Sequence, residues 1–214
     1  MTVMPLVRVG SFPFQRRFFY KRLLDILLII AALPVLVLVF ATIAFAVRAT
    51  SSGPAFFVQK RIGRNGLPFG VIKFRSMYTD AEQRRVEVLD SSDRAGICFK
   101  SKDDPRITAF GKLLRRSSLD ELPQLINVLM GQMSLVGPRP ALPQEVAEYP
   151  PAAMERLRVL PGITGAWQVA GRADLGFDEM VALDVSYVRN ATLLVDLRIL
   201  AQTFGAVVSG RGAY

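Results

Sequence analysis

The pattern of apolar positions sets one long uncharged run apart from a series of shorter segments. Residues 26–47 contain no charged side chain. At about 1.5 Å per helical residue, this run is long enough to cross a bilayer core of about 30 Å. A buried core helix is rarely apolar on every face, so the run predicts contact with a membrane. It is also longer than the apolar part of a secretory signal peptide, and no clear cleavage site follows it.

Positive charge flanks this run on both sides. The residues concerned are Arg16, Arg17, Lys21 and Arg22 before it, and Arg48, Lys60, Arg61 and Arg64 after it. Positive flanks favour the cytoplasmic side, and a single straight span cannot place both ends there. Pro34, near the middle, removes a helical hydrogen bond and kinks a helix. The residues leave two alternatives open: a helix that bends at Pro34 and returns to the same face, and a single-pass anchor with a tolerated proline.

Beyond the run, shorter patterns predict a helix-rich α+β domain over residues 51–214, after a flexible arm at 1–15 and a membrane helix at 16–50. Asn65-Gly66 between two apolar runs is a strong signal for a β-hairpin. Further helices are expected at 79–90, 107–116, 125–130, 177–189 and 193–208, the first opened by Thr79-x-x-Glu82. Residues 161–172 are punctuated by glycine and contain the single tryptophan, so we expect a loop there.

Two adjacent carboxylates, Asp120 and Glu121, lie between a pair of arginines and the helix expected at 125–130. Pro123 suits a first helical turn, which places Asp120 at or just before the helix, although Ser118-x-x-Glu121 also fits a capping box. The helix dipole and nearby guanidinium groups would favour the ionised form of both carboxyl groups. An ionised Asp beside arginines suits attack on a phosphate. The alternative is an ordinary helix cap with local ion pairs.

Charge and composition narrow the possible functions. The chain has 27 Lys and Arg against 18 Asp and Glu, a net charge of +9, which fits an anionic substrate, lipid surface or nucleic acid. No histidine is present, so the commonest general base and zinc ligand is excluded, and the single cysteine, Cys98, cannot form an internal disulfide. No glycine motif of the usual nucleotide-binding loops occurs. Nucleic acid is disfavoured because the charge lies beside an apolar membrane run. A non-catalytic scaffold that binds anionic lipid remains an alternative to an enzyme.

Several segments together resemble one family, the monotopic phosphoglycosyl transferases, or bacterial sugar transferases, which start glycan assembly on a polyprenyl phosphate. The resemblance runs from about Tyr20 to the C-terminus, in the order of the family's motifs. The matching stretches are 21–25 (KRLLD), 57–66 (FVQKRIGRNG), 73–77 (KFRSM), 118–124 (SLDELPQ), 134–140 (SLVGPRP) and 161–165 (PGITG).

The resemblance implies transfer of a sugar 1-phosphate from a UDP-sugar to undecaprenyl phosphate, with release of UMP. It assigns Asp120 as the nucleophile and Glu121 as the carboxylate associated with Mg²⁺, with Mn²⁺ as a possible substitute. The residues expected to bind substrate phosphates are Lys73, Arg75, Arg115, Gln124, Arg139 and Arg172. Taken singly, the basic residues among them also suit strand-edge charges or partners for carbonyl groups.

The resemblance also implies a re-entrant membrane helix kinked at a proline, here Pro34, and a place on the cytoplasmic face of the bacterial inner membrane. In the family a serine often precedes this proline, whereas Leu33 does so here. The sugar is expected to be galactose or glucose, with an acetamido sugar as the open alternative. The chain is expected to represent the catalytic core of larger members. Expected partners are membrane lipid, a second copy in a homodimer and other enzymes of glycan assembly, with no nucleic acid.

Overall fold

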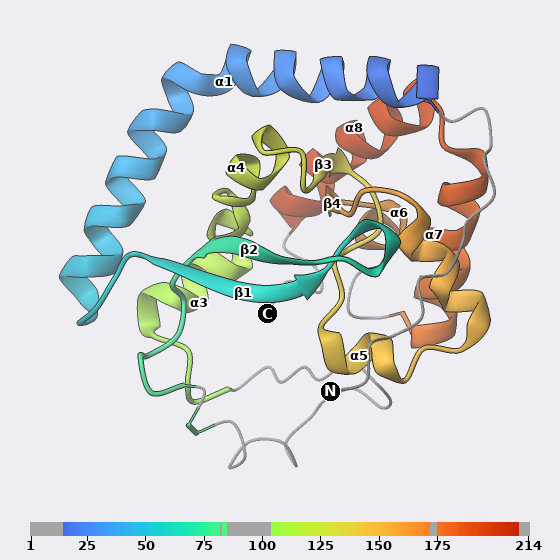
Figure 1. The fold of residues 1–214 in the computed structure, drawn as a ribbon. Helices are drawn as coiled ribbons and strands as arrows, with labels where there is room; N and C mark the ends of the chain where they lie inside the picture. The colour runs from blue at the N-terminus through green and yellow to red at the C-terminus, as the bar shows by residue number, and fades with distance from the viewer. Residues whose placement is uncertain (1–14, 82, 85–103, 172–174, 210–214) are drawn as a thin grey trace.

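A long bent helix and a small mixed domain make up the structure, a computed structural model that describes residues 15–81, 83–84, 104–171 and 175–209 (Figure 1). The helix-rich α+β class is confirmed. The elements are α1 (Gln15–Thr50), β1 (Phe56–Ile62), β2 (Pro68–Phe74), α3 (Ala109–Arg116), α4 (Gln124–Leu129), β3 (Ser134–Val136), α5 (Pro143–Ala147), β4 (Gly162–Thr164), α6 (Ala166–Ala170), α7 (Phe177–Asn190) and α8 (Leu193–Ser209), with short 3-10 helices at Arg64–Gly66, Leu119–Glu121 and Pro151–Arg158.

Helix α1 contains the apolar run and Pro34. Figure 1 shows that α1 bends part-way along its length and that its two arms run along two sides of the domain. Within the described residues, Phe19–Thr50 is the one helix long and apolar enough to cross a membrane by length and composition. Only 11% of the most apolar 18-residue stretch of this helix is buried, so most of its side chains face outward. An apolar surface of this kind is costly to leave in water.

The first arm of α1 is held by three charged side chains, each bound to a different element. Lys21 Nζ lies 2.7 Å from a carboxylate oxygen of Asp196 in α8. The guanidinium of Arg22 donates to the carbonyls of residues 128 and 129 at the end of α4. Asp25 accepts a 2.7 Å hydrogen bond from Ser134 Oγ at the start of β3. These contacts fix the first arm along the domain.

The second arm of α1 is fixed by packing and by one arginine. Ile43 and Val47 are buried in a cluster with Phe74 of β2 and Leu114 of α3. Arg75 donates to the carbonyl groups of the two serines that follow α1, residues 51 and 52. Both ends of α1 are therefore attached to the domain.

The predicted hairpin is confirmed. Strands β1 and β2 pair antiparallel, with a register from Phe56 opposite Phe74 to Ile62 opposite Pro68. At the turn, Asn65 and Gly66 have φ values of 58° and 76°. Asn and Gly are the residues that adopt this left-handed conformation at least cost, which explains why the hairpin forms here.

A second sheet was not predicted. Strands β3 and β4 pair in parallel, with Ser134 opposite Gly162 and Val136 opposite Thr164. The loop expected at 161–172 was therefore wrong for most of that segment, which forms β4 and then α6. Three-residue strands are too short to show a period of two, so the pattern carried no signal.

The helix expected at 79–90 is not formed in its described part. Residues 79–81 and 83–84 form turns, and 85–90 lie outside the described residues. The preceding chain is held extended, because Met77 bridges to Ile107 and the Tyr78 N–H donates to the carbonyl of residue 106. The local capping pattern at Thr79 is overridden by this long-range pairing.

Candidate active site

Asp120 and Glu121 lie in a 3-10 turn, Leu119–Glu121, between α3 and α4. Ser118, just before the turn, has φ 56°, a left-handed conformation that is uncommon for serine and reverses the chain after α3. Its side chain does not cap the turn, so the predicted capping box was wrong. Helix α4 begins at Gln124, so Asp120 precedes the helix, as predicted. Pro123 is the N-cap residue and lies one position before the first turn in which it was expected.

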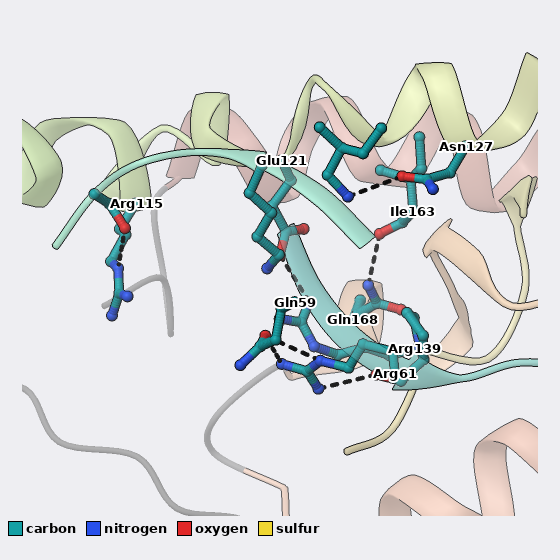
Figure 2. A network of polar contacts seen from close by, with 12 residues as sticks. Gln59, Arg61, Arg115, Glu121, Asn127, Arg139, Ile163 and Gln168 are labelled. Atoms are coloured by element: carbon teal, nitrogen blue, oxygen red, sulfur yellow. Dashed lines mark hydrogen bonds and ion pairs between the residues drawn. The ribbon is translucent and has the colours of Figure 1, made fainter. Parts of the chain in front are cut away.

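Glu121 bridges two basic side chains from distant parts of the chain. Its Oε1 accepts a 2.8 Å hydrogen bond from Lys73 Nζ of β2 and a 3.0 Å hydrogen bond from Arg139 Nη1 (Figure 2). Burial alone would raise the pKa of Glu121, but the positive charges and hydrogen bonds of these partners hold that pKa far below its usual range. Glu121 is therefore an ionised carboxylate at neutral pH, as predicted.

Asp120 has a different environment, although it is the next residue. It is 7% exposed, and burial raises its pKa to about 6, while Lys73 opposes the shift and Glu121 adds to it. Lys73, Arg115 and Arg139 do favour the ionised form of Asp120, as predicted for nearby positive charge, but the loss of hydration outweighs them and leaves the pKa raised. At neutral pH the carboxylate is still ionised, and it lacks the full hydration that would weaken it as a nucleophile.

Basic side chains surround this carboxylate pair from three elements. Lys73 extends from β2, and burial lowers its pKa although Glu121 raises it. Arg115 lies near the C-terminal end of α3, where its Nε donates to Ser76 Oγ at 2.9 Å, and its charge lowers the pKa of Asp120. Arg139 completes the group from the loop after β3. Such a cluster can hold the oxygens of an anionic substrate beside Asp120.

The loop that carries Arg139 is fixed through close backbone contact with β4. Gly137 N–H donates to the carbonyl of Thr164, and Gly162 N–H donates to the carbonyl of Pro138, each at 2.9 Å. A Cβ atom on Gly162 would lie 2.0 Å from the Gly137 nitrogen. Only glycine permits this approach, which accounts for glycine in both the 134–140 and 161–165 motifs.

The remaining predicted residues have varied positions. Gln124 is buried as the first residue of α4. Arg75 points to the end of α1 and is not brought to the carboxylate pair by its described hydrogen bonds. Arg172 lies outside the described residues.

Sequence reasoning assigned no role to two groups that support this site. Asn127 of α4 is fully buried and bonds to β2: its Oδ1 accepts from Ile72 N–H at 3.0 Å, and its Nδ2 donates to the Gly70 carbonyl at 2.7 Å. Arg61 of β1 donates to Gln59 of the same strand and to the Pro140 carbonyl in the Arg139 loop (Figure 2). The spacing of Gln59 and Arg61 puts them on one face of a strand, a signal that was available. Nothing in the sequence pointed from Asn127 to β2.

The carboxylates also bear on the expected Mg²⁺. Among the described residues, no group of three or more His, Cys, Asp or Glu gathers as a preformed metal cage. Mg²⁺ is commonly held by one or two carboxylates together with substrate phosphates and water. Asp120 and Glu121 supply hard oxygen ligands of this kind, so the residues fit a metal ion that binds together with a phosphate substrate.

Comparisons with known proteins identify the family of this chain. The family model described as bacterial sugar transferase matches residues 16–210. The exopolysaccharide production protein ExoY of Sinorhizobium fredii is 42% identical over 91% of this chain and 88% of its own length.

Two larger relatives match as well. The galactosyl transferase CpsE of Streptococcus agalactiae is 48% identical over 75% of this chain and 36% of its own length. The undecaprenyl-phosphate galactose phosphotransferase of Salmonella typhimurium is 41% identical over 92% of this chain and 42% of its own length. The chain thus spans well under half of these two relatives. The match over nearly all of this chain and of ExoY shows that the protein belongs to the bacterial sugar transferase family, a family of transferase enzymes.

Proposed function

We propose that this protein transfers a hexose 1-phosphate, from UDP-galactose or UDP-glucose, to undecaprenyl phosphate and releases UMP. This would be the first membrane step of an exopolysaccharide or related glycan. The observation that carries the proposal is the pair of adjacent carboxylates with opposite pKa shifts, Asp120 and Glu121, among Lys73, Arg115 and Arg139. The names of relatives support the acceptor and the sugar, since one is an undecaprenyl-phosphate galactose phosphotransferase.

The first step is a displacement at phosphorus. A carboxylate oxygen of Asp120 attacks the phosphorus that carries the sugar, a bond forms between them, and the bond to the bridging oxygen of the diphosphate breaks, so that UMP leaves with its electron pair. Phosphoryl transfer depends mainly on in-line positioning and on neutralising charge. Lys73, Arg115 and Arg139 supply fixed positive charge for this purpose, and the reaction needs no histidine.

The second step returns the enzyme to its starting state. A phosphate oxygen of the lipid acceptor attacks the same phosphorus, the aspartyl–phosphorus bond breaks, and the carboxylate of Asp120 is regenerated. Two displacements through a covalent intermediate imply ping-pong kinetics. A bound Mg²⁺, held by Glu121 with Asp120 and substrate oxygens, would supply Lewis acidity and reduce repulsion between the carboxylate and the diphosphate.

The bend of α1 bears on where the protein lies relative to the membrane. We propose that α1 is re-entrant, with both ends on the cytoplasmic face of the inner membrane. Both of its ends bind the same domain, and Pro34 lies inside the helix. A domain held against the membrane in this way can meet a soluble nucleotide sugar and a lipid phosphate at one site.

The decisive experiment is trapping of the intermediate. Protein in nanodiscs is incubated with UDP-galactose or UDP-glucose and no lipid acceptor, and peptides are examined by mass spectrometry. We expect a hexose-phosphate adduct on the peptide that contains Asp120, with one equivalent of UMP released. An adduct on Glu121 would exchange the two roles, and no adduct together with sequential kinetics would support direct transfer. No UMP release from any UDP-sugar, with lipid binding intact, would favour the scaffold alternative.

A further inference from the structure

The backbone on both sides of Arg139 is anchored by different elements. On one side, the carbonyl of Pro138 accepts from Gly162 N–H of β4 at 2.9 Å. On the other side, the carbonyl of Pro140 accepts from Arg61 Nη1 of β1 at 3.0 Å. Both of these hydrogen bonds are made to backbone carbonyls of the residues next to Arg139. Both therefore act on where its backbone lies, and through that on where its guanidinium can reach.

Gln59 holds Arg61 in the orientation that this contact requires. Its Oε1 accepts from Arg61 Nε at 3.1 Å and from Arg61 Nη2 at 2.7 Å, which leaves Nη1 directed at the carbonyl of Pro140 (Figure 2). The guanidinium group is planar, so fixing two of its nitrogens fixes the direction of the third. The next residue, Ile62, adds a backbone bond of 2.9 Å to the carbonyl of Ala141. Strand β1 thus braces the outer side of the loop.

We infer that Gln59 and Arg61 are positioning residues for the reaction, acting through Arg139. The inference rests on the proposed function, because it treats Arg139 as a ligand of the substrate phosphates. The Arg139 side chain is 34% exposed and one of its nitrogens is engaged by Glu121, so it has capacity left for a substrate oxygen. A misplacement of about 1 Å is enough to cost about a hundredfold in rate in a site of this kind.

Single substitutions measure the size of the effect. Arg61→Ala is expected to lower kcat/KM for the UDP-sugar by about 10- to 100-fold. Gln59→Ala leaves the Arg61 charge in place but removes its orienting partner, so it should cause a smaller loss. Gln59→Glu keeps an oxygen that can accept both bonds from Arg61, so its kcat/KM should stay much closer to wild type than that of Gln59→Ala. Lys60→Ala is the matched control, since Lys60 is an exposed cation on the same strand whose side chain faces the other way, and it should stay close to wild type.

A double-mutant cycle separates positioning from direct contact. If Arg61 acts through Arg139, then Arg61→Ala should have almost no further effect, less than about twofold, in an Arg139→Ala background. Equal losses in both backgrounds would overturn the inference, because they would mean that Arg61 acts on the substrate or on another group. A wild-type rate for Arg61→Ala would also overturn it. Should that variant fail to fold, the Gln59→Ala and Gln59→Glu pair gives the same cycle with Arg139.

Binding of inorganic pyrophosphate to the detergent-purified protein, measured by calorimetry, supplies a readout that needs no turnover. Arg61→Ala should weaken this binding only when Arg139 is present. Absence of turnover with this coupling intact would count against the proposed function alone. Turnover with equal weakening in both backgrounds, or no pyrophosphate binding by wild type, would count against the positioning role alone.

Discussion

Lys73 Nζ lies 2.8 Å from Glu121 Oε1, although the two residues are 48 positions apart in the sequence. This contact joins β2 of the hairpin to the turn before α4. In the part of the chain that the structure describes, it gives Glu121, but not the adjacent Asp120, an ion-pair partner on β2. The pKa of Glu121 is held far below its usual range, while that of Asp120 is raised to about 6. Neighbouring carboxyl groups whose pKa values are shifted in opposite directions are suited to different roles.

The two carboxylates should respond differently to removal of their charge. Asp120→Asn keeps the shape of the side chain but removes the attacking oxygen anion, so UMP release should fall by about four orders of magnitude or more. Glu121→Gln removes the proposed metal ligand and both ion pairs, so it should also cripple the enzyme, with partial rescue by raised Mg²⁺. Assays of UMP release across a Mg²⁺ series measure both effects.

The exposed Glu148→Gln is a suitable control for this pair and should leave the rate unchanged. A wild-type rate in Asp120→Asn would remove Asp120 from the mechanism.

The rate should depend on pH through Asp120. Its pKa is about 6, so below that pH the carboxyl group is protonated and cannot attack, and kcat/KM should rise through about pH 6 and then level off. Lys73 lowers the pKa of Asp120, so Lys73→Met should move the midpoint to higher pH as well as reduce the rate. Steady-state rates in overlapping buffers give both midpoints. An unchanged midpoint in Lys73→Met would show that the profile reports another group.

Turnover is expected to require a divalent cation. The available ligands are carboxylate and phosphate oxygens, which favour Mg²⁺ or Mn²⁺ over softer metals. Excess EDTA should abolish UMP release, and Mg²⁺ or Mn²⁺ should restore it. Full activity in excess EDTA would contradict this expectation.

Both ends of α1 should be accessible from the cytoplasmic side. In a Cys98→Ser background, Arg16→Cys and the exposed position Ser52→Cys can be labelled in inverted and right-side-out vesicles. Labelling of both from the same side supports the re-entrant helix, and labelling from opposite sides means that α1 spans the membrane. Pro34→Ala should favour a straighter helix, which would shift the Arg16→Cys label toward the other face.

Asn127 should contribute strongly to stability. Asn127→Ala would leave the Ile72 N–H and the Gly70 carbonyl of β2 without their side-chain partner, at a cost of about 2–4 kcal/mol. For a chain of this length the loss corresponds to a fall in Tm of about 4–16 °C. Asn190→Ala removes an exposed bond to the Ser186 carbonyl and should change stability by less than about 0.5 kcal/mol. Thermal unfolding in detergent compares the two, and equal shifts would show that Asn127 does not brace β2.

Local patterns predicted the elements whose signals are local. The hairpin depends on Asn65-Gly66, and α3, α7 and α8 on the spacing of their apolar residues, so each was found within a few residues of its bounds. The β3–β4 pair depends on contact between residues 28 positions apart in strands of only three residues, and its pairing is invisible in either strand alone.

The sequence predicted which residues form the site better than it predicted how they are arranged. Resemblance to a family pointed to Asp120, Glu121, Lys73 and Arg139, which do gather. The raised pKa of Asp120 could not be foreseen, because it depends on how completely the folded chain excludes water. The brace from β1 was missed because the acceptor for Arg61 is a backbone carbonyl, and backbone acceptors leave no mark in a sequence.

The attachment of α1 at both ends bears on the order of events during synthesis. Lys21 emerges from the ribosome 175 residues before its partner Asp196. The carbonyl that accepts from Arg22 and the hydroxyl that donates to Asp25 also come more than 100 residues after them. With α1 in the bilayer, the first arm therefore stays without these partners until most of the domain has been translated. The ion pair with Asp196 can form only after α8 has been made, so attachment of the first arm is completed only when this last helix of the domain is present.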